Sequence, residues 1–377
     1  MAVEAALRIP PRPEMVLGDD AVDDLPEFVR RLGEDAAFVV TDRGLVDAGV
    51  AGRVARALES SGLRCAVHDD VGANPSVADV LAGSDALRSF GRAAIVAVGG
   101  GSPIDAAKAM ALHAANGGPL EALAYGAADL APAPPLIAVP TTAGTGTETN
   151  GFAVIDDPAA RRKRYVGHAS ALPRFAVLDP VLSTSAPQRV TAACGIDVLA
   201  HAVESLQART GNAYSTALGL EAVRLVMANL PAVVCDPDDR AGRTAMLLAA
   251  HLAGLAFAIT GLGTAHAIGH ALSARYGTPH GVALAAVLPL VVHMNAGERG
   301  PETARIAAAA GVAPERFPDA VAALEERSGL RPSLRELGVP RRELPALADA
   351  ALADAVVDNA PRVPSRGELV RLLEAAF

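Results

Sequence analysis

The sequence predicts an N-terminal α/β domain built on a parallel sheet, followed by an all-α C-terminal domain. Two observations support this fold class. Up to Pro187, short apolar runs alternate with helical patterns, as in a parallel sheet with helices on both faces. After Pro187, stretches rich in Ala and Leu follow one another between Gly and Pro residues. A chain of 377 residues suits two domains better than one, and we place them at residues 1–187 and 188–377.

Five apolar runs in the first domain have the length and composition of buried strands. They lie at residues 36–40, 64–67, 93–98, 136–139 and 176–178, and helices are expected near 47–61, 76–90 and 103–115. The second domain is predicted to contain helices at 188–207, 212–233, 239–260, 264–275, 281–295, 301–310 and 317–328. Residues 366–377 are expected to form a closing amphipathic helix.

The composition limits the partners that the chain can have. Hydrophobic residues make up 51% of the sequence, enough for a large core, and the net charge is −9. Because an acidic chain without a long basic run binds nucleic acid poorly, we expect no nucleic-acid partner. The three cysteines are widely spaced, and the sequence contains no apolar signal region or membrane-spanning run. We therefore expect a cytoplasmic protein that binds no membrane.

A glycine turn at residues 99–102, with the sequence Gly-Gly-Gly-Ser, follows the apolar run 93–98. Ser102 is predicted to be the N-cap of the next helix, with Pro103 at its first position and Asp105 completing a capping box. Glycines let a ligand approach the backbone closely, and a helix N-terminus favours an anion. The turn is therefore a candidate phosphate site. The alternative is an ordinary strand-to-helix connection.

A second polar loop follows the apolar run 136–139 and contains Thr141, Thr142 and Thr145. Hydroxyl groups at the carboxyl end of a strand suit a crevice that binds a ribose or a phosphate. The alternative is a loop whose hydroxyls bond its own backbone. Because two such loops follow consecutive predicted strands, ligand binding is the preferred interpretation.

An acidic residue, Asp42, follows the predicted strand at 36–40. A carboxylate at this point can accept hydrogen bonds from both hydroxyls of an adenosine ribose, and it would repel a 2′-phosphate. This residue therefore favours NAD over NADP as a cofactor. The alternative is a turn aspartate that precedes Gly44.

Two pairs of metal-binding side chains occur at helical spacing. Asp197 and His201 are four residues apart in an apolar helix, which puts both on one face. His266 and His270 repeat that spacing, and His280 follows ten residues later. One carboxylate with two or three imidazoles is a ligand set for a first-row divalent ion, without deciding between iron, zinc, manganese and nickel. The alternative is a chance clustering of histidines near helix ends.

The chain resembles the iron-containing (group III) alcohol dehydrogenase family over nearly its full length. Several motifs in one order carry the resemblance: GGGSPIDAAKAMAL (99–112), PTTAGTGTETN (140–150), LDP (178–180), GIDVLAHAVES (195–205), GLGTAHAIGHAL (261–272) and GTPHGVALA (277–285). It extends to the turn at 70–75 and to the tail at 359–369. The resemblance implies a dehydroquinate-synthase-like architecture, in which a dinucleotide-binding α/β domain and a helical domain have the active site in the cleft between them.

The resemblance also implies roles for individual residues. The residues that correspond to the family's metal ligands are Asp197, His201, His266 and His280. The residues that correspond to its cofactor site are Asp42, Asn74, Gly99, Gly100, Gly101, Ser102, Asp105, Thr141, Thr142, Thr145 and Lys163. His270 corresponds to a histidine near the nicotinamide that relays a proton. Phe152 lies near the expected substrate pocket.

The implied activity is that of an NAD-linked alcohol dehydrogenase or aldehyde reductase. Such an enzyme moves a hydride between the nicotinamide C4 and an alcohol or aldehyde held by the metal. The implied metal is Fe(II), with Zn(II) or another divalent ion as the alternative. The substrate would be a small molecule, and analogy with the family implies a homodimer.

Other activities on the same architecture stay open. A glycerol or polyol-phosphate dehydrogenase also uses Asp and His ligands, but the PTTAGTG and TPHG contexts are not expected there. A maleylacetate-reductase-like enzyme, or a reductase of a phosphonate- or carboxylate-bearing aldehyde, needs basic pocket residues, for which Arg189 and Arg275 are the candidates. A dehydroquinate-synthase-type reaction needs a pocket rich in Lys and Arg, and residues 188–290 contain few. The complete ligand set disfavours a binding protein without activity.

Overall fold

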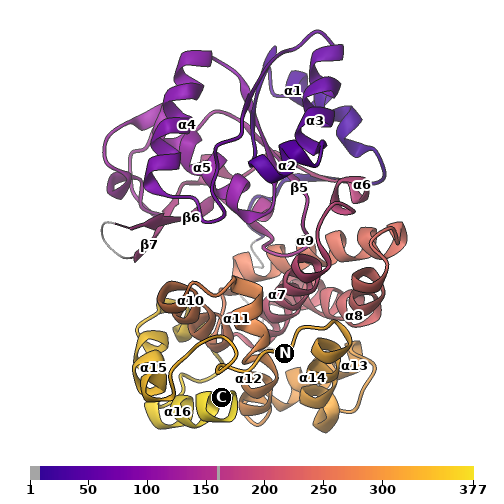
Figure 1. The fold of residues 1–377 in the computed structure, drawn as a ribbon, viewed down its shortest axis with the longest axis vertical. Coiled ribbons are helices and arrows are strands. Elements are labelled where there is room, and N and C mark those ends of the chain that lie inside the picture. Colours follow the sequence, from indigo (N-terminus) through magenta and orange to yellow (C-terminus); the bar gives the residue numbers. More distant parts are fainter. Residues whose placement is uncertain (1–8, 159–161) are drawn as a thin grey trace, which may run out of the picture. The chain divides into compact units, whose positions relative to one another are not determined.

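The computed structural model describes residues 9–158 and 162–377, which Figure 1 draws in colour. Its contacts divide the chain into two compact units. One unit comprises residues 12–186, and the other comprises residues 187–377 together with the described residues 9–11. The first unit contains a parallel sheet with helices, and the described part of the second is helical. The predicted fold class is therefore confirmed.

The first unit is built on a six-stranded sheet in which every pair of neighbouring strands is parallel. The strand order is β1-β8-β5-β4-β2-β3. The strands are β1 (Glu14–Leu17), β2 (Ala36–Val40), β3 (Arg64–His68), β4 (Ala94–Gly99), β5 (Leu136–Pro140) and β8 (Phe175–Leu178). All but β1 occupy the predicted positions to within one residue. β1 lies at the sheet edge with none of its residues buried, so it lacks the apolar run of a core strand.

Helices cover both faces of this sheet (Figure 1). They are α1 (Leu25–Arg31) and α3 (Val50–Ser60) on one face and α4 (Val77–Phe90) and α5 (Gly101–Asn116) on the other. Alternate residues of β2 enter the two cores: Phe38 and Val40 pack under α4 and α5, whereas Ala37 and Val39 pack under α1 and α3. Because both faces are covered, β2, β4 and β5 are buried along their whole length and read as continuous apolar runs.

A two-stranded hairpin stands apart from the main sheet and was not predicted. It pairs β6 (Phe152–Asp157) with β7 (Arg162–Gly167) in antiparallel register. Ala153, Ile155 and Val166 are buried, while the residues between them along β6 are only half-buried. Burial thus alternates along β6 with a period of two, but its sequence, Phe-Ala-Val-Ile-Asp-Asp, does not alternate between apolar and polar residues, so it lacks the pattern that predicts a strand of this kind.

One predicted helix is shifted and another is divided in the structure. The predicted helix at 47–61 corresponds to α3, which starts at Val50, and the short helix α2 (Arg43–Asp47) before it was not predicted. Gly49 separates the two helices with a φ of 77°, which glycine adopts without steric cost. The segment 281–295 contains α11 (His280–Ala285) and α12 (Leu288–Asn295). Val287 leaves helical geometry there, and Pro289 lies in the first turn of α12, where its missing N–H costs nothing. The short helix α6 (Pro180–Ser183) ends the first unit.

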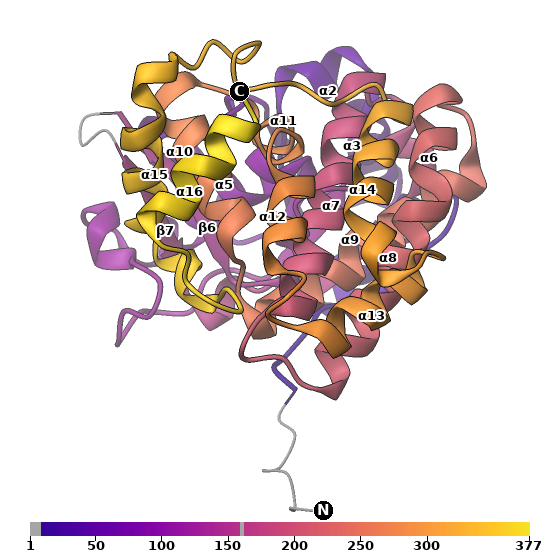
Figure 2. The ribbon, with the colours of Figure 1, turned by 90° about the horizontal axis from the view of Figure 1, so that it is seen from below.

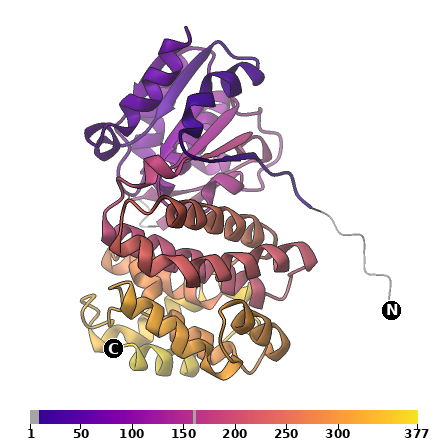
Figure 3. The ribbon, with the colours of Figure 1, turned by 90° about the vertical axis from the view of Figure 1, so that its right-hand side faces the viewer.

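The second unit contains three long helices that lie side by side in Figure 3. They are α7 (Gln188–Gln207), α8 (Ala213–Cys235) and α9 (Arg240–Thr260). Shorter helices follow (Figure 2). These are α10 (Thr264–Tyr276), α11, α12, α13 (Gly300–Ala309), α14 (Phe317–Arg327), α15 (Leu344–Leu352) and α16 (Arg366–Ala375). The predicted positions hold for all except α15, which was not predicted although Leu344, Leu347 and Ala351 bury one helical face.

Two of the described helices, α8 and α9, are long and apolar enough to cross a membrane. Both pack against α7 and against each other. Val226 of α8 and Ala253 of α9 are completely buried in that packing. Core packing within the unit therefore accounts for part of their apolar composition.

Candidate functional site

The predicted cofactor residues follow three adjacent strands of the sheet. Asp42 follows β2, the turn at 99–102 follows β4, and Thr141 follows β5. The order of the sheet reverses here, since β3 lies beyond β2 on one side while β5 lies beyond β4 on the other. In open α/β sheets, ligands bind outside the carboxyl ends of the strands at such a switch point. The structure therefore gathers these three segments where sheets of this kind bind ligands.

The helix after the glycine turn begins earlier than predicted. α5 starts at Gly101, and the N-cap residue is Gly100, so the prediction that Ser102 is the N-cap is wrong. Ser102 lies inside the first turn, and its hydroxyl donates to the carbonyl oxygen of Ala73 at 2.5 Å. Within the described chain no side chain caps α5. Its first backbone N–H groups are thus left for an anionic group.

The glycine turn packs directly against the threonine loop. A Cβ atom on Gly101 would lie 2.8 Å from Cγ2 of Thr145, and one on Gly100 would lie 3.1 Å from Oγ1 of Thr142. Gly99 has a φ of 152°, a conformation that other residues rarely adopt. Side chains at these positions would collide with the threonine loop or strain the backbone. Glycine is therefore needed at residues 99–101 for the two predicted cofactor loops to lie side by side.

Asp105 does not form the predicted capping box, because the helix starts before Ser102. One of its carboxylate oxygens accepts a hydrogen bond from the Thr147 hydroxyl at 2.5 Å. The other accepts from the backbone N–H of Val154 at 2.9 Å. Since both oxygens are engaged, the structure gives Asp105 a supporting role, and its contact with a cofactor stays a prediction.

Lys108, which was not predicted as a site residue, is completely buried in the same network. Its Nζ lies 2.6 Å from both the carbonyl and hydroxyl oxygens of Thr147, 2.8 Å from the Phe152 carbonyl and 3.1 Å from the Asn150 side-chain oxygen. Burial lowers the pKa of Lys108 to about 8. Its spacing of three residues from Asp105 on α5 could have indicated the pair. Together the two side chains anchor the threonine loop and β6 to α5.

Asp42 is half-buried, whereas Asn74 is exposed. Oδ1 of Asp42 accepts a hydrogen bond from the backbone N–H of Leu45 at 3.0 Å and so caps α2. The turn interpretation therefore holds for this oxygen, and ribose binding by Asp42 stays a prediction. Asn74 is exposed and follows Ala73, whose carbonyl is tied to Ser102.

Lys163 and Phe152 lie at opposite ends of one face of the β6–β7 hairpin. The Nζ of Lys163 is 3.1 Å from the Asp156 carboxylate. The ring of Phe152 meets that of Tyr125 edge-on, with centroids 5.7 Å apart. Contact of Lys163 with a cofactor, and of Phe152 with a substrate, stays a prediction.

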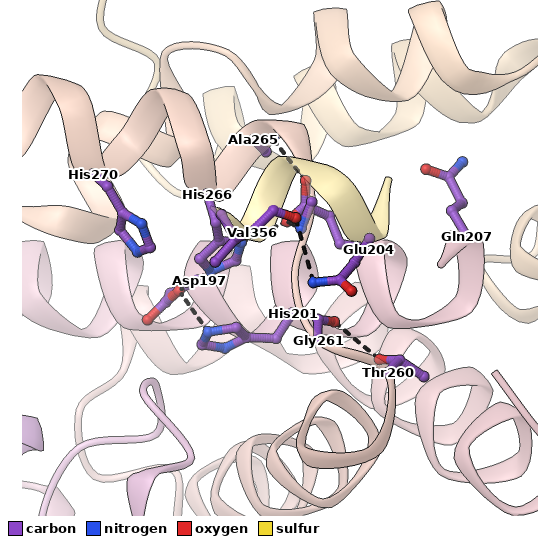
Figure 4. Close-up of polar contacts among 12 residues, drawn as sticks. Asp197, His201, Glu204, Gln207, Thr260, Gly261, Ala265, His266, His270 and Val356 are labelled. Atoms are coloured by element: carbon purple, nitrogen blue, oxygen red, sulfur yellow. Dashed lines mark hydrogen bonds and ion pairs between the residues drawn. The ribbon is translucent and has the colours of Figure 1, made fainter. Parts of the chain in front are cut away.

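Three of the four predicted metal ligands, all histidines, converge on one carboxylate oxygen of the fourth, Asp197. Asp197 and His201 come from α7 and His266 from α10, as Figure 4 shows, and His280 is the first residue of α11. Oδ1 of Asp197 lies 3.4 Å from Nε2 of His201 and 3.5 Å from Nε2 of His266. Nε2 of His280 is 3.7 Å from the same oxygen. One ligand atom each from Asp197, His201 and His266 lie within 4.8 Å of one another.

Two atoms of this cluster lack the hydrogen bonds that buried polar atoms usually make. Among the described residues, neither Oδ1 of Asp197 nor Nε2 of His266 has a hydrogen-bond partner. Burial raises the pKa of Asp197, but His201, His280 and His266 outweigh this effect and hold the pKa well below its usual range. The cluster thus offers one ionised oxygen and three imidazoles at a single point. This donor set fits a first-row divalent ion.

Glu204 of α7 orients His266 and was not predicted. Its Oε2 lies 2.6 Å from Nδ1 of His266. The same carboxylate accepts the backbone N–H groups of Gly263 and Ala265, at 2.8 and 2.6 Å. Burial raises the pKa of Glu204, but these hydrogen bonds outweigh it and lower the pKa. With Nδ1 held as a donor, Nε2 of His266 is left as a ligand atom. His201 lies three residues before Glu204 on the same face of α7, and this spacing could have indicated that Glu204 belongs to the site.

Replacing Glu204 by glutamine is expected to weaken metal binding by roughly 10- to 100-fold, the usual cost of losing such a supporting residue. The carboxylate of Glu204 faces three donors, namely two backbone N–H groups and the imidazole Nδ1. The glutamine amide has one acceptor oxygen, so at least one of these donors would face the NH2 group of the amide instead. Titration with Zn(II) against a competing chelator measures the change. Glu221→Gln is the matched control, because Glu221 lies in α8 and pairs with the exposed Arg224. An unchanged affinity in Glu204→Gln would contradict this role.

His270, the predicted proton relay, lies one helical turn after His266 on α10. Its ring centroid is 6.1 Å from that of His266 and 5.4 Å from that of His280. Its Nδ1 is 2.7 Å from Oδ2 of Asp354. Asp354 was not predicted, since 84 residues separate the two positions and no local spacing joins them.

Family models match both parts of the chain. The model described as iron-containing alcohol dehydrogenase matches residues 11–180, and the C-terminal model of the Fe-containing alcohol dehydrogenase family matches residues 191–377. Lactaldehyde reductase from Escherichia coli K12 is 35% identical over 371 residues, which cover 96% of this chain and 97% of that protein. Alcohol dehydrogenase 4 from Saccharomyces cerevisiae YJM789 is 33% identical over 97% of both chains.

Solved structures are similar over the same length. A 1,3-propanediol oxidoreductase has a TM-score of 0.95 at 32% identity and covers 99% of this chain and 100% of its own. A sulfoacetaldehyde reductase from Bifidobacterium kashiwanohense, in complex with NAD+, has a TM-score of 0.92 at 26% identity over 99% of both chains. The relatives are dehydrogenases and reductases of alcohols and aldehydes, which confirms the predicted enzyme class. The chain belongs to the iron-containing alcohol dehydrogenase family.

Proposed function

We propose that this chain is a metal-dependent, NAD-linked alcohol dehydrogenase or aldehyde reductase for a small substrate. The observation that carries the proposal is the convergence of three imidazoles on the buried oxygen of Asp197. Membership of the family supports it, as does a similar structure that binds NAD+. We propose residues 1–187 as the cofactor domain and residues 188–377 as the metal and substrate domain.

Asp197, His201, His266 and His280 would hold the metal. Fe(II) is the ion that the family suggests, and Zn(II) fits the same donors. When bound, such an ion supplies Lewis acidity toward the oxygen of an alcohol or a carbonyl group. Glu204 would keep His266 in the tautomer that leaves Nε2 for the ion.

The residues after β2, β4 and β5 would hold the dinucleotide. The uncapped N-terminus of α5 suits a pyrophosphate, and Asp42 suits the adenosine ribose, which favours NAD over NADP. A nicotinamide cofactor supplies hydride exchange at its C4. Lys108 and Asp105 would keep the threonine loop in place beside it.

His270 would carry the proton of the reacting hydroxyl. His270→Ala is expected to keep the metal and to lower turnover by roughly 10²- to 10⁴-fold, the usual contribution of a positioned acid–base group. Metal analysis of the purified variant, together with its kcat, checks this expectation. Loss of the metal in the variant would instead make His270 a ligand.

We also propose a cytoplasmic homodimer. β1 lies at the edge of the sheet with Met15 exposed, and an edge strand is a surface on which a second chain can add. None of the three cysteines forms a disulfide in the described chain, in keeping with a reducing compartment. Sedimentation analysis of the purified protein tests the oligomeric state.

The experiment that tests the function is NADH oxidation by protein stripped of metal and then given Fe(II) or Zn(II) without oxygen. The substrates are a neutral aldehyde, an anionic aldehyde and maleylacetate. We expect turnover that depends on the restored metal and is fastest with the neutral aldehyde. Arg275 is a candidate for binding an anionic substrate, but it lies 3.9 Å from Glu343, whose carboxylate balances its charge. NADH binding without turnover on any of these substrates would overturn the proposal.

A further inference from the structure

Asp354 is held so that one oxygen faces His270. It follows α15 and is the N-cap of a short 3-10 helix at Ala355–Asn359. Its Oδ1 accepts the backbone N–H of Val356 at 3.1 Å, and its Oδ2 lies 2.7 Å from Nδ1 of His270. The backbone therefore fixes the direction of the carboxylate, and the imidazole is bound by a group with a defined orientation.

This pairing decides which ring nitrogen of His270 bears the proton. Burial raises the pKa of Asp354, but the hydrogen bond from His270 and the N–H of Val356 outweigh it and lower the pKa. An ionised carboxylate only accepts hydrogen bonds, so Nδ1 must be the donor. In the neutral imidazole, the lone pair is then on Nε2.

The same arrangement occurs one helical turn earlier. His266 has its Nδ1 on Glu204, and its Nε2 is 3.5 Å from Asp197. Figure 4 shows His266 and His270 as neighbours on α10. The ring of His270 also stacks on that of His280. Nε2 of His270 is thus a lone-pair nitrogen on a ring that lies beside the candidate metal ligands.

We propose that Asp354 is a positioning residue for proton transfer, which holds His270 in the tautomer whose Nε2 exchanges the substrate's hydroxyl proton. This inference rests on the proposed function. In alcohol oxidation the O–H bond breaks and its proton forms an N–H bond at Nε2. The C–H bond breaks as well, and its hydrogen leaves with both electrons to the oxidised nicotinamide. In aldehyde reduction the same proton returns to the oxygen. Asp354 stays ionised throughout and exchanges no proton.

The test is Asp354→Asn. The amide keeps an oxygen for the N–H of Val356 and turns its NH2 group toward Nδ1, which must then accept a hydrogen bond. The proton of the neutral His270 ring therefore lies on Nε2, and Nε2 has no free lone pair. We expect kcat to fall by roughly 10²- to 10⁴-fold, the range known for this change in a Ser–His–Asp triad and for acid–base groups in general. Metal content and NADH affinity are expected to stay unchanged.

A second readout does not depend on turnover. NMR of isotope-labelled histidine in the Zn(II)-loaded protein distinguishes the two imidazole tautomers, and His270→Ala identifies the signal. We expect the His270 signal to change from the Nδ1–H to the Nε2–H form in Asp354→Asn. Asp358→Asn is the matched control, because it removes the same charge from an exposed position in the same 3-10 helix. Asp354→Glu, which keeps a carboxylate, is expected to recover part of the activity.

The outcomes separate this inference from the proposed function. If the unmodified enzyme reduces no aldehyde, the function itself is wrong. If His270→Ala is slow while Asp354→Asn is as fast as Asp358→Asn and keeps the original tautomer, then Asp354 does not position His270. Loss of metal or of folding in both Asp354→Asn and Asp354→Glu, with no tautomer change, would assign Asp354 a structural role only. Adding Asp354→Asn to His270→Ala is expected to cause no further loss of kcat.

Discussion

Asp197→Ala is expected to lose its metal and to lose activity by about 10³-fold or more. Asp197 supplies the one carboxylate among the four candidate ligands, and all three imidazoles converge on its Oδ1. Removing it leaves three neutral donors and removes the charge that balances a divalent cation. A Lewis acid contributes several kcal/mol to the transition state, which corresponds to a rate loss of about 10³-fold. Metal analysis after gel filtration and NADH oxidation measure the two losses.

The control for Asp197→Ala uses the other unit of the chain. The predicted cofactor residues lie in residues 12–186, and Asp197 lies in the second unit. NADH binding, followed by fluorescence, is therefore expected to be retained in the variant. Asp197→Asn tests the charge separately, because it keeps an oxygen at the same position. A variant that holds one metal per chain with normal turnover would refute the ligand assignment.

The strands that are buried on both faces are all predicted from the sequence, and the edge strand β3 is predicted as well although none of its residues is buried. β2, β4 and β5 are continuous apolar runs because each of their residues meets one of the two cores. β1 is bonded along one edge with no buried residue, and β6 is buried on one side. In β1 and β6 the apolar run is short and adjoins acidic residues, so the sequence does not predict these two strands. Burial does not explain in the same way which helices were predicted. α15 was not predicted, although its buried residues have ordinary helical spacing.

The site residues that could be predicted are those with local spacing. Asp197 and His201 are four residues apart on one helix, and the sequence alone shows that relation. The partners that orient the histidines come from elsewhere: Glu204 is 62 residues from His266, and Asp354 is 84 residues from His270. These pairs exist only once the helices are packed. The start of α5 was mispredicted for a different reason. Ser102 has the composition of an N-cap residue, but the helix begins at Gly101 and so includes Ser102 in its first turn.

Glu325→Gln is expected to stabilise the second unit at alkaline pH. Glu325 lies on α14 and is completely buried, and neither of its carboxylate oxygens has a hydrogen-bond partner among the residues that the structure describes. Burial raises its pKa to about 9, from 4.5 for the free side chain. The folded protein therefore keeps a proton on Glu325 at neutral pH that the unfolded chain releases. Stability must fall as the pH rises from 4.5 toward 9, by about 1.4 kcal/mol for each pH unit.

Glutamine has nearly the same shape and carries no titratable proton, so Glu325→Gln removes this dependence. We expect its denaturation midpoint to match the unmodified protein near the low end of the range and to exceed it increasingly at higher pH. Urea denaturation at several pH values measures this difference. Glu326→Gln is the matched control, since Glu326 is the exposed neighbour and pairs with Arg331 at the surface. A parallel pH dependence in both variants, or destabilisation by Glu325→Gln at every pH, would mean that Glu325 is ionised and paired in the folded chain.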